Sequence, residues 1–218
     1  MDEVIRYLDD SKCPGPDGID GIIVKRRHKC LPKFWMSLFN KCFALSCFPK
    51  EWKKARVIAI PKSDKTKLHS VQGYRGISLL SILGKCLEKL VIERLNYFLK
   101  TAGQIPSLQY GFTASRSTAD AIKTVSDFIG HSRKLGLKCC LLTLDIAGAF
   151  VNAWHPGILA QLWKLNCPSN TYSMVRNFLS DRMAQVTLRN SSSSKHITKG
   201  VLWDRCQDQP YGILLLAT

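Results

Sequence analysis

One acidic residue stands directly after an apolar run, and its position suggests chemistry. Leu141-Leu142-Thr143-Leu144 leads to Asp145, so a buried strand would deliver a carboxylate at its end. Such an acid is costly unless a metal ion, an arginine or a helix N-terminus is its partner. One interpretation is a Mg²⁺ ligand, because two-metal phosphoryl transfer needs hard oxygen ligands on a rigid element. The other is an N-cap for the turn that follows, and the local sequence leaves both open.

Two cations occupy positions from which they could bind a triphosphate together. Lys62 follows Ile60-Pro61 at the end of a β-branched run, and Arg75 lies in Tyr74-Arg75-Gly76-Ile77-Ser78. Arginine would bind phosphate through two parallel hydrogen bonds and lysine as a point charge. The alternative for each is a solvated surface cation.

A loop that leads into a helix combines a cation with hydroxyl groups. Gln109-Tyr110-Gly111-Phe112 is followed by Ser115-Arg116-Ser117-Thr118. A helix N-terminus of this kind can hold a backbone phosphate of a nucleic acid, although a capped helix explains it equally well. Lys25-Arg26-Arg27-His28-Lys29 could contact phosphate or direct nuclear import, but a solvated face is the more common explanation.

The overall charge favours a polyanionic partner. The chain of 218 residues carries 32 Lys and Arg against 16 Asp and Glu, a formal net charge of +16. Residues 49–100 hold twelve of the cations and four of the acids, a net of +8 and half of the excess. Such a charge is typical of proteins that bind nucleic acid or an acidic membrane surface. Within this segment we assign Lys53, Lys54 and Lys65 to nucleic-acid binding.

The same sequence argues against a membrane-spanning, a secreted and a zinc-binding protein. No apolar run is long enough to span a membrane, and the acidic N-terminus lacks the features of a secretory signal. The nine cysteines are odd in number and show no CxxC or zinc-ligand spacing, which favours reduced thiols. We therefore expect an intracellular protein, in the nucleus or cytoplasm, that is not secreted.

The periodicity of apolar residues predicts an α/β or α+β protein. A boundary is expected in the loop near 131–138, between a basic N-terminal part and the strand with Asp145. We expect helices over 2–10, 19–47, 78–100, 117–135, 156–165 and 169–180, strands over 57–60 and 141–146, loops over 64–75 and 101–116, and a hairpin of 184–189 with 195–199 around Ser191–Ser194.

Six short motifs in a fixed order make the chain resemble a known family. Together they resemble the reverse transcriptase, or RNA-directed DNA polymerase, of LINE-type non-LTR retrotransposons, from about residue 8 to about residue 200. The motifs are Pro14-Gly15-Pro16-Asp17-Gly18, Phe48-Pro49 to Trp52-Lys53, Ile60-Pro61-Lys62, Tyr74 to Leu80, Gln109 to Phe112 with Ser117-Thr118, and Leu144-Asp145-Ile146-Ala147-Gly148-Ala149-Phe150.

The resemblance implies a right-hand polymerase fold, with a fingers-like subdomain over 1–135 and the N-terminal part of a palm over 136–200. It implies an RNA template, a DNA primer, a deoxynucleoside triphosphate (dNTP) and Mg²⁺ as partners. It also implies roles for individual residues. Asp145 would be the first catalytic aspartate and the Ile146 carbonyl a second metal oxygen, Phe150 would exclude the ribose 2′-OH, Lys62 and Arg75 would bind the dNTP, and Arg116 would contact the template.

The chain also departs from the family pattern. Gly76 replaces the usual Pro, Val151 replaces a second Asp, and the Gly-rich motif that Lys199-Gly200 should open does not continue. The Tyr-Ala-Asp-Asp segment is absent. One carboxylate cannot hold two Mg²⁺ ions in catalytic geometry. We therefore expect a polymerase fragment with little or no activity. The alternatives are a non-enzymatic basic RNA- or DNA-binding remnant and a remnant that is not expressed.

The genetic code offers a testable explanation for residues 201–218. Reading the possible codons from the third base of Leu202 permits Met-Gly-Ser-Val-Ser-Gly-Pro-Thr-Leu-Trp-Asn, which restores Gly-Ser, Gly-Pro and Leu-Trp of the missing motif. We predict that a base was lost near codon 201 and shifted the frame. Genomic DNA should continue, in the alternate frame, to a Tyr-Ala-Asp-Asp-like segment. An alternate frame without that segment would refute the prediction.

Overall fold

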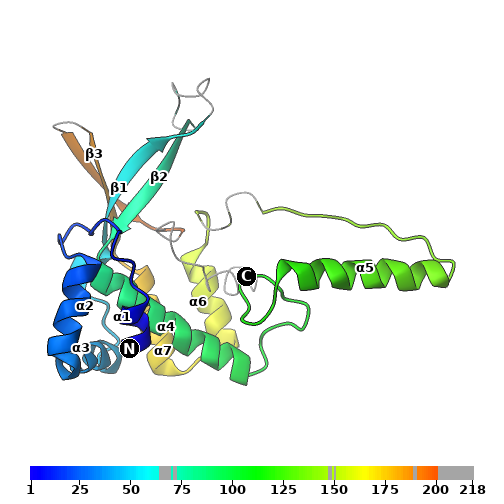
Figure 1. The fold of residues 1–218 in the computed structure, drawn as a ribbon, viewed down its shortest axis with the longest axis horizontal. Coiled ribbons are helices and arrows are strands. Elements are labelled where there is room, and N and C mark those ends of the chain that lie inside the picture. The colour runs from blue at the N-terminus through cyan, green and yellow to red at the C-terminus, as the bar shows by residue number, and fades with distance from the viewer. Residues whose placement is uncertain (64–69, 71–72, 147–148, 150, 189–190, 201–218) are drawn as a thin grey trace.

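The computed structural model describes residues 1–63, 70, 73–146, 149, 151–188 and 191–200, which form a mixed α/β fold (Figure 1). In chain order the elements are α1 (Asp2–Arg6), α2 (Gly21–Cys30), α3 (Pro32–Ala44), the 3-10 helix η1 (Lys50–Lys53), β1 (Lys54–Pro61), β2 (Tyr74–Leu80), α4 (Ile82–Thr101), α5 (Thr118–Lys134), α6 (His155–Lys164), α7 (Ser169–Leu179), β3 (Arg182–Leu188) and β4 (Ser191–Ile197).

The sheet joins strands from opposite ends of the chain, in the order β2-β1-β3-β4. β1 pairs with β2 in an antiparallel ribbon, and β3 pairs with β4 in another. Between the ribbons, β1 and β3 are parallel over four residue pairs, from Lys54 with Met183 to Val57 with Val186. A parallel pair needs a long crossover connection, and here most of the chain lies between the two strands.

The helices other than α5 build one core below the sheet (Figure 1). Its centre includes Phe39, Leu87, Leu162 and Met174, each at most 1% exposed. The core runs from Val4 to Leu99 and again from Ala153 to Leu179. The boundary expected near 131–138 is thus bridged by both the core and the sheet.

Buried polar and aromatic side chains connect the segment before β1 with α7 and the start of β3. Arg182 is 1% exposed, and its guanidinium carbon lies 4.4 Å from the ring centroid of Phe178. Its Nη1 donates to the Phe178 carbonyl at 3.2 Å. The ring centroids of Phe178 and Phe48 are 5.1 Å apart, and the backbone N–H of Phe48 donates to Asn177 Oδ1 at 2.8 Å. Aromatic rings thus cover a charge that water would otherwise solvate.

Residues 106–146 leave this body as an excursion (Figure 1). α5 extends away from the helices, and the chain returns beside it in an extended path through 138–146. α5 begins with a capping box, in which Ser117 and Asp120 each accept from the other's backbone N–H. Ile122 and Phe128 on this helix remain 67% and 68% exposed.

The predicted strand over 141–146 is wrong. These residues adopt no strand in the structure, and Leu142 and Leu144 are 78% and 86% exposed. A strand requires a neighbour for its backbone groups and apolar cover for its side chains. Within the described ranges no strand pairs with this segment. Leu141 lines a hollow with Val125 and Phe128 of α5, but the side chains of Leu142 and Leu144 stay exposed.

Of the loop expected over 64–75, residues 64–69 and 71–72 lie outside the described ranges, and Tyr74 and Arg75 belong to β2. Three further expectations need correction. The helix over 19–47 is two helices, because Pro32 starts α3. The helix over 78–100 begins only at Ile82, where Ser81 is its N-cap, and Ser78–Leu80 complete β2. The serine run is part of β4 rather than a turn. The other helices were correctly predicted, with shifted ends.

No helix among the described residues is long and apolar enough to cross a membrane. The cysteines in this part of the chain are free thiols. Burial raises the pKa of the Cys86 thiol to about 12, so this side chain acts as an apolar filler.

We expect Phe178→Ala to lower the free energy of unfolding by about 3–5 kcal/mol, because it removes a buried ring and the cover of Arg182. Urea unfolding followed by circular dichroism would measure this change. Phe34→Ala is the control, since Phe34 is 56% exposed and should cost far less. Equal losses in both variants would contradict this account of the joint.

Candidate nucleotide and nucleic-acid interface

The ribbon of β1 and β2 brings the two phosphate-binding candidates to the same end of the sheet. Ile60 pairs with Arg75, and the backbone N–H of Lys62 donates to the Gly73 carbonyl at 2.7 Å. Lys62, the first residue after β1, is therefore two positions along the chain from Ile60, the partner of Arg75. The Lys62 side chain is exposed. The Arg75 side chain lies outside the described part, and only its place in β2 is known.

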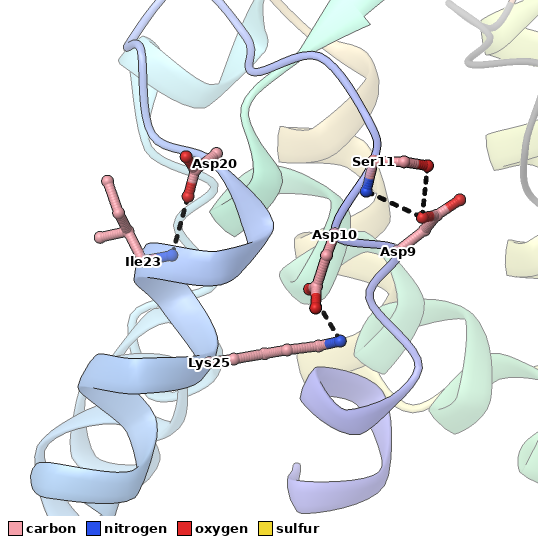
Figure 2. Close-up of polar contacts among 6 residues, drawn as sticks. All are labelled: Asp9, Asp10, Ser11, Asp20, Ile23 and Lys25. Carbon is pink, nitrogen blue, oxygen red and sulfur yellow. Dashed lines mark hydrogen bonds and ion pairs between the residues drawn. The ribbon is translucent and has the colours of Figure 1, made fainter.

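The connection from α1 to α2 is fixed by short polar contacts (Figure 2). Asp9 accepts from the backbone N–H and the hydroxyl of Ser11 at 2.9 and 2.7 Å. These hydrogen bonds lower the pKa of Asp9. Asp10 pairs with Lys25 at 2.9 Å, and Asp20 caps α2 by accepting a backbone N–H. Lys25, from the basic run at 25–29, thus has an acidic partner.

This connection carries the first motif, whose glycine packs on the start of α4. A Cβ atom at Gly15 would lie 2.5 Å from the backbone carbon of Leu80 and the nitrogen of Ser81. Only glycine permits so close an approach. The loop over 14–18 therefore supports the junction at which β2, with Arg75, becomes α4.

Two of the three lysines that we assigned to nucleic-acid binding have different environments in the structure. Lys53 is only 3% exposed, and its ammonium lies 3.5 Å from Ser180 Oγ. Burial lowers the pKa of Lys53. This side chain packs in the joint and is turned away from solvent, and its contact with nucleic acid stays an untested prediction. Lys54 is half exposed and pairs with Glu51 at 2.8 Å. Lys65 lies outside the described residues.

Arg116 is held within its own loop. Its Nη1 lies 3.1, 2.7 and 2.5 Å from the carbonyl oxygens of Pro106, Ser107 and Gln109. The guanidinium carbon is also 6.0 Å from the Tyr110 ring centroid. Converging carbonyls satisfy a guanidinium and fix the chain around it. In the structure Arg116 therefore fixes the conformation of the loop that contains the Gln109–Phe112 motif.

The candidate catalytic acid is solvent-exposed. Asp145 follows the extended segment, and the Ile146 carbonyl accepts the backbone N–H of Ala149 at 3.3 Å in a turn. Phe150, the candidate residue for excluding ribose, lies outside the described ranges. The structure thus gives defined positions to Lys62, at the end of the β1–β2 ribbon, and to Asp145, at the end of the extended segment.

The donor set does not fit the two Mg²⁺ ions that the resemblance implies. Among the described residues, no group of three or more Asp, Glu, His or Cys side chains could hold a metal ion. Asp145 supplies one carboxylate, whereas Mg²⁺ in nucleotide sites is held by carboxylates and phosphates together. No chemical step through a metal can be assigned to these residues.

Two features of the structure escaped the sequence analysis. Arg182 reads as an ordinary basic residue at the start of a strand, yet it is buried. His155 was not singled out, yet it is 8% exposed and its Nε2 lies 2.8 Å from the Gly200 carbonyl. The only local signal for His155 is its position immediately before Pro156, at the start of α6.

Comparison with known proteins finds one family model and several relatives from mobile elements that match this chain. Residues 60–202 match the family described as "Reverse transcriptase (RNA-dependent DNA polymerase)". The chain is 33% identical over 199 residues to "RNA-directed DNA polymerase from mobile element jockey" of Drosophila melanogaster, covering 91% of this chain and 22% of that protein. It is 30% identical over 197 residues to "Probable RNA-directed DNA polymerase from transposon BS" of the same species, covering 90% and 22%.

A third relative is "Putative 115 kDa protein in type-1 retrotransposable element R1DM" of Drosophila melanogaster, at 31% identity over 228 residues. This alignment covers 97% of the chain and 21% of that protein. The chain thus spans about a fifth of the length of these curated relatives.

We expect Arg116→Lys to loosen the loop over 106–110, because one ammonium cannot reproduce the planar guanidinium among three carbonyls. Limited proteolysis should cleave this loop several-fold faster in the variant. Arg133→Lys, near the exposed end of α5, is the matched control and should leave cleavage unchanged. Equal cleavage of wild type and Arg116→Lys would contradict the assigned role.

Proposed function

Because the chain belongs to the reverse transcriptase (RNA-dependent DNA polymerase) family, we propose that it is a fingers-and-partial-palm fragment of a non-LTR retrotransposon polymerase. The observation that carries the proposal is the β1–β2 register, which gathers Lys62 and Arg75 at one end of a rigid ribbon. Cations held on a strand pair bind phosphate with little loss of conformational freedom.

In this proposal residues 1–135 are fingers-like and residues 136–200 begin the palm. Lys62 and Arg75 contact the triphosphate of an incoming dNTP, and Phe150 excludes a ribose 2′-OH. The RNA template and DNA primer are the nucleic-acid partners. Arg116 contributes by shaping the loop before α5, and Lys54 is the remaining described candidate for a phosphate contact.

The fragment is proposed to lack polymerase activity. Asp145 and the Ile146 carbonyl would contribute to a divalent-metal site in a complete palm. Here the acid is exposed and has no cluster of acidic neighbours among the residues the structure describes. Without a second carboxylate, the attacking and leaving oxygens of a phosphoryl transfer are not stabilised together.

The codon reading around residue 201 carries the proposal that residues 201–218 are a frameshifted tail, although the R1DM alignment covers 97% of the chain and reaches into them. The family match ends at residue 202, although sixteen more residues follow in the sequence. This end coincides with codon 201, where the proposed base loss lies. The tail itself lies outside the described residues.

A second candidate function is non-enzymatic binding of RNA or DNA. The net charge of +16 and the exposed Lys62 on the ribbon favour it. Binding through phosphate would be strongly salt-dependent, because each neutralised phosphate releases counterions. This function needs no assembled metal site.

We expect Lys62→Ala to weaken binding of a fluorescent dNTP about fivefold, because a charge contact at an exposed site contributes about 1 kcal/mol. Fluorescence anisotropy at low salt would measure the affinity. Lys100→Ala is the control, since Lys100 is also exposed but lies in the last turn of α4. Equal affinities of the wild type and Lys62→Ala would contradict the triphosphate role.

Primer extension on an RNA template tests the catalytic part of the proposal with the same protein. We expect no incorporation by the wild-type chain or by Asp145→Ala. Incorporation that disappears in Asp145→Ala would overturn the proposed inactivity. Nucleic-acid binding that is equal at low and high salt would argue against the second candidate function.

A further inference from the structure

Two segments that are far apart in the sequence are joined beside the candidate catalytic loop. The Gly200 N–H donates to the Ala153 carbonyl at 2.8 Å, and His155 Nε2 lies 2.8 Å from the Gly200 carbonyl. Lys199 Nζ lies 3.2 Å from Asn152 Oδ1. Residues 199–200 are thus attached to residues 152–155 through both backbone groups of Gly200 and one side-chain pair.

Gly200 is the residue type that this contact requires. Its φ is +78°, and a Cβ atom there would lie 2.5 Å from the Val151 carbonyl oxygen. Any other residue would be strained in the backbone and would also collide with Val151. The close approach and the positive φ are independent constraints, and both select glycine.

His155 is well placed to fix this arrangement. It is the first residue of α6 and 8% exposed, so the helix and the core restrict its ring. The Gly200 carbonyl can only accept a hydrogen bond, so Nε2 must carry the proton. A donor inside the protein competes with little water, and the contact is correspondingly specific.

We infer that His155 is a positioning residue, which holds Lys199-Gly200 against residues 151–153. This inference rests on the proposed function, in which Lys199-Gly200 opens the Gly-rich segment of the polymerase. The junction would set where that segment starts relative to the catalytic loop. In a complete palm, His155 would act on the geometry of the site through Gly200 and would not touch substrate.

The test uses amide hydrogen exchange measured by NMR on this chain. His155→Ala should accelerate exchange of the Gly200 amide at least about fivefold, which corresponds to one lost hydrogen bond. His155→Gln keeps a side-chain N–H donor and should restore part of the protection. His131→Ala, on the exposed face of α5, is the matched control and should have no effect.

Gly200→Ala provides a second route that leaves the core histidine in place. It should undock residues 198–200 while the thermal midpoint of the protein stays near that of the wild type. In ¹⁵N-labelled wild-type protein, long-range ¹H–¹⁵N spectra should show the proton of the His155 ring on Nε2. This signature should change in Gly200→Ala, although the histidine itself is retained.

Two results would overturn the inference. One is unchanged Gly200 exchange in folded His155→Ala. The other is an equal acceleration throughout α4 and at Gly200, which would indicate only a general loss of stability. If His155→Ala does not fold, an unchanged imidazole signature in Gly200→Ala would be decisive against it. None of these measurements involves nucleotide, so failed dNTP binding would refute the proposed function and leave the junction intact.

Discussion

The parallel pairing of β1 with β3 is the constraint on which the rest of the structure depends. It joins backbone segments separated by more than a hundred residues, and the loop-closure entropy must be offset locally. The offset comes from the buried cluster of Arg182, Phe178 and Phe48 and from the Asn177 cap on the Phe48 N–H. An enclosed guanidinium is stable only while its aromatic and carbonyl partners remain, so the joint tolerates little change.

The candidate functional residues differ in how many tertiary contacts fix the segments on which they lie. β1 extends beyond its pairing with β3 and there pairs with β2 alone. Lys62 and Arg75 lie at that end of the ribbon, and the Gly15 loop packs at the opposite end, against Leu80. Asp145 lies at the end of the excursion, beyond the α5 capping box and the exposed return segment. The positions proposed to bind phosphate therefore lie on a paired ribbon, whereas Asp145 follows a segment with few tertiary contacts among the described residues.

Local patterns predicted what local forces decide. The α5 capping box, the α4 apolar face and the β-branched core of β1 are visible in the sequence because neighbouring residues create them. Burial of Lys53 and Arg182 depends on a strand pairing between distant segments, and nothing near either residue signals it. The strand over 141–146 failed for the converse reason. Its apolar pattern is real, but a strand exists only beside a partner. Of the candidate site, the ribbon positions were predictable and the Arg116 and His155 contacts were not.

The exposed return segment has a consequence for the fate of the protein in a cell. Residues 139–144 carry no charge, are rich in leucine and expose an extended backbone without a strand beside it in the described part of the chain. Such a segment is a template for intermolecular β-pairing, and folded proteins normally cover or charge their edges to prevent it. A chaperone or protease that recognises extended apolar peptides would find its substrate here without any unfolding. The abundance of this protein would then be set by quality control more than by the stability of its core.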